Sequence, residues 1–211
     1  CFRRNFPYSE HQLSQARLGQ IVDYIAKDSS IYEVILSGGE PLLLNNRKLE
    51  QLITSLTKIP HLHTLRIHTR LPLVLPQRFD PDLLGILSNM RLQAVVVWHT
   101  NHAQELGAAQ AKLSKILHNS GIIQLNQSVL LAQINDQASI LAALSHRLFD
   151  LQILPYYLHL LDRVMGTAEF LVTDQQAQTT YQQLQARLSG YLVPRLVREE
   201  ANNRQGKTQV Y

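Results

Sequence analysis

The sequence of 211 residues has very little cysteine and no long apolar run. Its single cysteine, Cys1, excludes an intramolecular disulfide framework and cannot by itself make a zinc or iron–sulfur site. Its longest apolar runs, such as residues 94–98, fall far short of the roughly 18–20 apolar residues that cross a bilayer. We therefore expect a cytoplasmic protein without a membrane partner.

Charge of either sign is also scarce, at 17% of residues, and the formal net charge is +4. No block of consecutive like charges exceeds two residues. Binding to nucleic acid would need a concentrated basic stripe with interleaved aromatic side chains, so we do not expect a nucleic-acid partner. The length and the 45% hydrophobic content predict one globular domain, or at most one domain with a small appendage.

Hydrophobic periodicity predicts an α/β fold. Short apolar runs alternate with stretches of helical period, an order typical of a parallel sheet with helical crossovers, either doubly wound or a barrel. The predicted strands are residues 31–36, 62–68, 92–98, 122–126, 152–157 and 192–197. The predicted helices are residues 18–25, 49–56, 80–89, 103–119, 137–149 and 174–189, the last capped by Gly190.

Polar residues collect where the predicted strands end. Parallel α/β sheets bind ligands at the carboxyl ends of their strands, so these residues predict one shared site. Loop residues are often polar for no functional reason, but their joint placement after five strands favours a site. They are Ser37 to Glu40, then His68, Thr69 and Arg70, then His99, Asn101 and His102, then Asn126, Gln127 and Ser128, and finally His159 and Asp162.

Several of these features are ambiguous one by one. The Gly38–Gly39 pair lets a ligand approach the backbone, but it also suits an ordinary turn. The Arg3–Arg4 pair suits either a carboxylate or phosphate clamp, or a solvated basic segment. His99 and His102 have a spacing that binds metal on a helix, yet they fall in a predicted loop without a Cys or carboxylate ligand nearby, which disfavours zinc.

The charged residues near the carboxyl end are equally open to two interpretations. Lys207, beside a glycine, is suited to Schiff-base chemistry but is also typical of a solvated lysine. Asp162 and the Glu199–Glu200 pair would suit a cationic substrate group, or a charged surface turn. Only a wider pattern decides between these alternatives.

That wider pattern comes from six phrases spread along the chain: CFRRNFPY (1–8), LSGGEPLL (36–43), LRIHTRLP (65–72), NQSVLL (126–131), PYYLH (155–159) and GYLVP (190–194). Together they resemble the lysine 2,3-aminomutase family of radical S-adenosylmethionine (SAM) enzymes, and the match runs nearly the full length of the chain. The phrases Cys-Phe-Arg-Arg, His-Leu-Leu-Asp and the closing Arg-Glu with Lys-Thr favour the bacterial branch that makes (R)-β-lysine for translation elongation factor P.

The resemblance implies a radical SAM partial (β/α)6 barrel that lacks its first strand, over residues 1–190, followed by a C-terminal strand and PLP-lysine segment, residues 191–211. It also implies a [4Fe-4S] cluster on three cysteines spaced Cys-x3-Cys-x2-Cys, of which Cys1 matches the third. The other two would lie just upstream, so the chain is expected to be the C-terminal piece of a longer protein and inactive alone. Ser37, Gly38, Gly39 and Glu40 match the turn that binds the amino group of SAM.

The resemblance also assigns roles to substrate and cofactor residues. Arg3 matches the arginine that binds the carboxylate of lysine. Asp162 and Glu199, with Glu200 as a rival, match the carboxylates that hold its ε-ammonium group. Lys207 matches the lysine that carries pyridoxal 5′-phosphate (PLP). Further cofactor contacts are assigned provisionally to Thr69, Arg70, His99, Asn126, Gln127 and His159.

The implied function is conversion of L-lysine to (R)-β-lysine, with elongation factor P and its lysyl-transferring enzyme downstream. The alternatives are a free-lysine or glutamate 2,3-aminomutase, a degenerate binding module without catalysis, and an ordinary α/β phosphate-binding protein. The last fits the periodicity but not the assembled phrases. A homo-oligomer is compatible with the sequence.

Overall fold

The computed structural model describes residues 15–162, 164–199 and 207–210. In these ranges seven strands form one sheet, whose spatial order β1 to β7 follows the sequence. The first six are parallel to their neighbours, and β7 is antiparallel to β6. The strands are β1 (Glu33–Leu36), β2 (Thr64–Thr69), β3 (Gln93–Trp98), β4 (Ile123–Leu130), β5 (Leu154–Leu160), β6 (Arg195–Glu199) and β7 (Lys207–Gln209).

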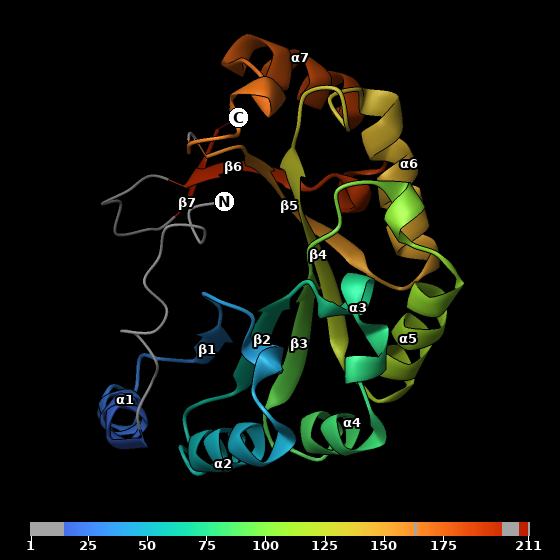
Figure 1. Cartoon of the computed structure of the whole chain (residues 1–211). Helices are drawn as coiled ribbons and strands as arrows, with labels where there is room; N and C mark the ends of the chain where they lie inside the picture. The colour runs from blue at the N-terminus through green and yellow to red at the C-terminus, as the bar shows by residue number, and fades with distance from the viewer. Residues whose placement is uncertain (1–14, 163, 200–206, 211) are drawn as a thin grey trace.

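The sheet curls into an open half-barrel, with helices along its outer face (Figure 1). This confirms the α/β partial barrel expected from the sequence. The helices are α1 (Gln15–Lys27), α2 (Asn46–Thr57), α3 (Leu71–Val74), α4 (Pro81–Ser88), α5 (Ala108–Asn119), α6 (Ala138–Asp150) and α7 (Asp174–Gln185). Short 3₁₀ turns occupy Pro41–Leu43, Pro76–Arg78, Ala103–Glu105, Ala168–Phe170 and Gly190–Leu192. None of the helices in the described ranges is long and apolar enough to cross a membrane.

The core lies between the sheet and its outer helices. Strand β3 (QAVVVW) supplies its centre, because five of its six side chains are buried, as expected for an inner strand of a parallel sheet. One cluster of buried residues packs β1 to β3 against α2, α4 and α5, and includes Leu49, Leu65 and Trp98. A second packs β5 and β6 against α6 and α7, and includes Leu158 and Leu196. Apolar packing thus fills the outer side of the sheet.

Several predicted boundaries need correction. The last predicted strand, residues 192–197, lies at Arg195–Glu199 instead. Strands β4 and β5 run four and three residues beyond the predicted ends at 126 and 157, so Gln127, Ser128 and His159 lie inside strands rather than in loops. The helix predicted at 103–119 is a 3₁₀ turn followed by α5, with Gly107 as the N-cap residue between them. Gly190 begins a 3₁₀ turn instead of capping α7, which already ends at Gln185.

Candidate functional site

The turn after β1 is open to a ligand. Gly38 and Gly39 have φ angles of +85° and +68°, in the left-handed region that favours glycine. A Cβ atom built on Gly38 would meet nothing within 4 Å, so the backbone conformation, and not crowding within the chain, requires glycine there. The exposed Ser37–Gly38 backbone is therefore accessible from outside.

Glu40 is fixed by bonds to its own turn and to the end of β2. Its Oε1 accepts hydrogen bonds from the Thr69 hydroxyl at 2.7 Å and from the Leu42 N–H at 3.3 Å. Its Oε2 accepts one from the Arg70 N–H at 3.0 Å. Thr69, a predicted cofactor contact, is fully buried and also accepts a hydrogen bond from the Leu71 N–H. It therefore fixes the position of the Glu40 carboxylate.

A row of polar side chains follows along β2, β3 and β4. The rings of His68 and His99 meet edge-on, with centroids 5.8 Å apart. The side-chain nitrogen of Gln127 lies 3.0 Å from His99 Nε2, which accepts its hydrogen bond when the ring proton is on Nδ1. The Gln127 Oε1 is buried and has no hydrogen-bond partner within the described ranges. The structure thus brings together the predicted residues His99 and Gln127.

The row continues onto β5. Gln127 is the register partner of Tyr157, whose ring lies edge-on to His159 at 5.6 Å between centroids. His159 is only 9% exposed and His68 only 6%, so both imidazoles lie within the protein. His68 was predicted only as one of the polar residues at the strand ends, and Tyr157 was not singled out. The available signal for Tyr157 was its spacing of two from His159, since alternate residues of a strand share a face.

Two tyrosines and an ion pair lie beside this row. Burial, followed by a hydrogen bond with Tyr156, raises the pKa of Tyr157 to about 12. Tyr157 is therefore a neutral phenol at physiological pH, able to donate a hydrogen bond. Arg66 donates to the Tyr156 hydroxyl at 3.1 Å and to Glu33 at 2.6 Å, so its charge is compensated by a carboxylate.

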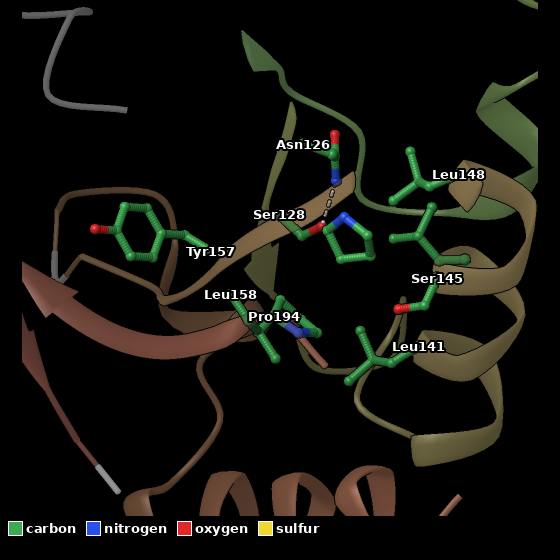
Figure 2. Close-up of a pocket in the computed structure, with 10 residues that line it drawn as sticks. Asn126, Ser128, Leu141, Ser145, Leu148, Tyr157, Leu158 and Pro194 are labelled. Atoms are coloured by element: carbon green, nitrogen blue, oxygen red, sulfur yellow. Dashed lines mark hydrogen bonds between the residues drawn. The ribbon is translucent and has the colours of Figure 1, made fainter. Parts of the chain in front are cut away.

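Asn126 and Ser128 face the other side of β4. The Asn126 oxygen accepts from the Thr100 N–H at 2.9 Å, and its nitrogen donates to the Thr100 carbonyl at 3.1 Å and to the Ser128 hydroxyl at 3.0 Å. Figure 2 shows both side chains beside a small cavity against α6, while Tyr157 points away from that helix. The cavity measures about 10 Å³, room for one water molecule. The structure therefore does not bring Asn126 together with His99 and Gln127.

The loop after β3 uses its polar side chains internally. His102 Nδ1 accepts a hydrogen bond from the Gln104 N–H at 3.2 Å and caps the 3₁₀ turn that follows. In the part of the chain that the structure describes, no group of three His, Cys, Asp or Glu side chains is arranged to hold a metal ion.

The predicted substrate and PLP residues come together in part. Asp162 is exposed just after β5, and Glu199 is the last residue of β6, the parallel neighbour of β5. The Cα atom of Glu199 is the register partner of that of Lys207 on β7, of which the backbone is described. Cys1, Arg3 and Glu200 lie outside the described residues.

The chain is similar to curated proteins along nearly its whole length. No family model matches it. L-lysine 2,3-aminomutase of Haemophilus influenzae is 49% identical over 201 residues, which are 95% of this chain and 60% of that protein. The proteins of the same name from Buchnera aphidicola and Escherichia coli are 48% and 44% identical, over 94% of this chain and 58% of theirs. The chain therefore spans about three fifths of these relatives.

Solved structures share the fold at low sequence identity. SuiB of Streptococcus suis bound to S-adenosylmethionine matches with a TM-score of 0.62 and 14% identity, over 91% of this chain and 45% of that one. A radical SAM methyltransferase from Sphaerobacter thermophilus matches with a TM-score of 0.57 and 14% identity, over 88% and 57%. The half-barrel is therefore the fold of radical SAM proteins.

Proposed function

We propose that the chain belongs to the lysine 2,3-aminomutase family and that the protein converts L-lysine to (R)-β-lysine by radical SAM chemistry. The identity of 44–49% over nearly the whole chain supports the reaction class. The structural observation that supports the proposal is the backbone pairing of Glu199 with Lys207, next to β5, the strand that Asp162 follows. Two carboxylates can form ion pairs with the ε-ammonium group of lysine, and a lysine side chain can carry PLP as a Schiff base.

The residues of the first turn fit SAM. An ammonium group needs oxygen acceptors, and the Ser37–Glu40 turn offers backbone carbonyls and a fixed carboxylate beside an open glycine. The orphaned Gln127 Oε1 marks a place for a hydrogen-bond donor on the ligand. When bound, SAM and a reduced [4Fe-4S] cluster supply the radical that abstracts hydrogen from the substrate. Cys1, the cluster ligand that the family resemblance assigns, lies outside the described residues.

The residues near β6 and β7 are suited to binding PLP and the substrate lysine. When bound to Lys207, PLP supplies the conjugated system through which the amino group migrates. The protein's own share is to hold lysine by both ends, with Arg3 proposed for its carboxylate and Asp162 and Glu199 for its ε-ammonium group. Residues that bind both ends of a substrate select it by length and charge.

Two of three alternatives are less consistent with these residues. Glutamate has no ε-ammonium group, so two carboxylates at its binding site would repel it. A binding module without catalysis has no evident use for Lys207. A free-lysine aminomutase differs from our proposal only in the fate of the product.

We assign the product to modification of elongation factor P, through a lysyl-transferring enzyme. The sequence phrases quoted above support that branch. We place the reaction in the cytoplasm, where thiols stay reduced and are available as cluster ligands.

The PLP assignment is tested by chemical trapping. The full-length protein is loaded with PLP, reduced with borohydride and digested, and the peptides are analysed by mass spectrometry. We expect a pyridoxyl group on Lys207, lost in Lys207→Ala and retained in the control Lys58→Ala, which removes an exposed lysine at the end of α2. A pyridoxyl group on another lysine, or none, would overturn this assignment.

A further inference from the structure

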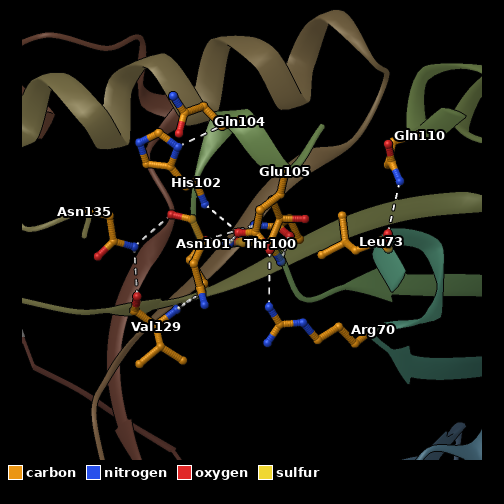
Figure 3. A network of polar contacts seen from close by, with 12 residues as sticks. Arg70, Leu73, Thr100, Asn101, His102, Gln104, Glu105, Gln110, Val129 and Asn135 are labelled. Atoms are coloured by element: carbon orange, nitrogen blue, oxygen red, sulfur yellow. Dashed lines mark hydrogen bonds and ion pairs between the residues drawn. The ribbon is translucent and has the colours of Figure 1, made fainter. Parts of the chain in front are cut away.

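Glu105 holds an unusual position between two strand ends. It is the last residue of the 3₁₀ turn after β3, and its side chain is 26% exposed. Its Oε1 accepts hydrogen bonds from the N–H groups of Asn101 at 2.7 Å and His102 at 2.9 Å. Its Oε2 accepts one from the Arg70 guanidinium at 3.3 Å, across a separation of 35 residues (Figure 3). The carboxylate therefore ties the end of β2 to the loop after β3.

Hydrogen bonds to β4 hold the loop after β3 in place. The Asn101 side-chain oxygen accepts from the Val129 N–H at 2.8 Å. The fully buried Asn135 donates to the carbonyls of Asn101 and Val129, both at 2.9 Å, and accepts from the Leu131 N–H at 2.7 Å. The position of Glu105 is thus set by a buried amide network rather than by its ion pair with Arg70.

Arg70 lies between two carboxylates. Its backbone N–H donates to Glu40, whereas its guanidinium pairs with Glu105. The three bonds that Glu40 accepts all come from neutral donors, and within the described ranges no salt bridge reaches it. The Arg70 side chain is 55% exposed, so it has room to move if Glu105 releases it. Glu40, which already accepts the Arg70 backbone N–H, is the carboxylate with which a freed guanidinium could pair.

We propose that Glu105 is a positioning residue of the SAM site. By holding the Arg70 guanidinium, it leaves the negative charge of Glu40 for the ammonium group of SAM. The inference rests on the proposed function, because it takes the Ser37–Glu40 turn as the SAM site. It adds a residue that lies in none of the sequence phrases and that acts only through Arg70.

A double-mutant cycle tests this role. The affinity for SAM is measured by equilibrium dialysis on the full-length protein, reconstituted anaerobically. Glu105→Gln keeps an oxygen for the Asn101 and His102 N–H groups but loses its charge, so we expect SAM to bind about tenfold more weakly, the factor that corresponds to one moderate charge interaction. In an Arg70→Ala background, which retains the N–H bond to Glu40, we expect Glu105→Gln to have no further effect.

Two controls separate positioning from general damage. Glu50→Gln, on the exposed face of α2, is expected to leave SAM affinity unchanged. Pyridoxyl labelling of Lys207 is expected to persist in Glu105→Gln, because a local change at the first turn leaves β7 intact. Unchanged SAM affinity in Glu105→Gln would overturn the inference, and so would an equal loss in the Arg70→Ala background. If the unmutated protein fails to bind SAM, the proposed function itself fails, and this inference with it.

Discussion

At the scale of single residues, the site consists of side chains that line the inner face of the sheet and side chains that support them from behind. His99 and Gln127 contact each other on the inner face. Thr69 and Asn126, which were also predicted to contact a cofactor, are buried and bond to Glu40 and to the Thr100 backbone. A polar residue in a characteristic phrase is therefore either a ligand contact or a support, and strand direction separates the two.

Asn126 gives a prediction at this scale. Replacing Asn126 with Ala leaves the buried Thr100 N–H without its acceptor, so we expect the free energy of unfolding to fall by about 1–3 kcal/mol. The measurement is chemical denaturation. The control Asn119→Ala, at an exposed position at the end of α5, should change stability by less than about 0.5 kcal/mol. Unchanged stability of Asn126→Ala together with lost SAM binding would show a direct cofactor contact instead.

At the scale of elements, most strands and helices follow from periodicity, and the exceptions have a common cause. The predicted ends of β4 and β5 fall short because the polar residues Gln127 and His159, which face the inner side of the sheet, interrupt the apolar runs. A strand that lines a polar face loses the hydrophobic signal there. Strand β7, with the sequence KTQ, has no apolar residue at all, and α3 has only four residues, so neither gives a periodic pattern. These elements depend on tertiary pairing that sequence patterns do not encode.

Helix α4 gives a pH-dependent prediction. The Asp80 carboxylate caps it by accepting the Leu83 N–H at 2.8 Å, and this bond, aided by Asn46 and Arg78, lowers the pKa of Asp80 below its ordinary value of 3.8. A carboxyl group whose pKa is lowered by folding stabilises the protein above its unfolded pKa, and this contribution is lost as the pH falls through its folded pKa. We expect Asp80→Ala to cost about 1 kcal/mol at neutral pH. The cost should shrink below pH 3.8.

A second capped helix provides the control. Thr173 caps α7 through a hydroxyl, which accepts the Gln176 N–H and does not titrate in this range. Thr173→Ala should therefore cost a similar free energy of unfolding at all these pH values. Urea denaturation of both variants from pH 7 downward measures the two costs. A cost of Asp80→Ala that stays constant over the whole range would contradict the charge-dependent account of this cap.

At the scale of the whole molecule, the α/β half-barrel was predicted correctly from the sequence. The Ser37–Glu40 turn, His99 and Gln127 all lie on or next to its parallel strands. The phrases did not indicate Glu105, because its role depends on a contact with Arg70 that exists only after folding. The division into residues 1–190 and 191–211 stays a prediction, although β6 and β7 continue the same sheet.

The most direct test of the central claim is formation of β-lysine by the full-length protein. The protein is reconstituted anaerobically with iron, sulfide and PLP, supplied with SAM and a reductant, and given lysine labelled with ¹⁵N at the α-amino group. We predict a β-lysine product, identified by mass spectrometry, whose label has moved to the β-carbon, and no turnover of glutamate. Turnover of glutamate, or unchanged lysine despite bound PLP and bound SAM, would contradict the proposal that this chain belongs to a lysine-isomerising enzyme.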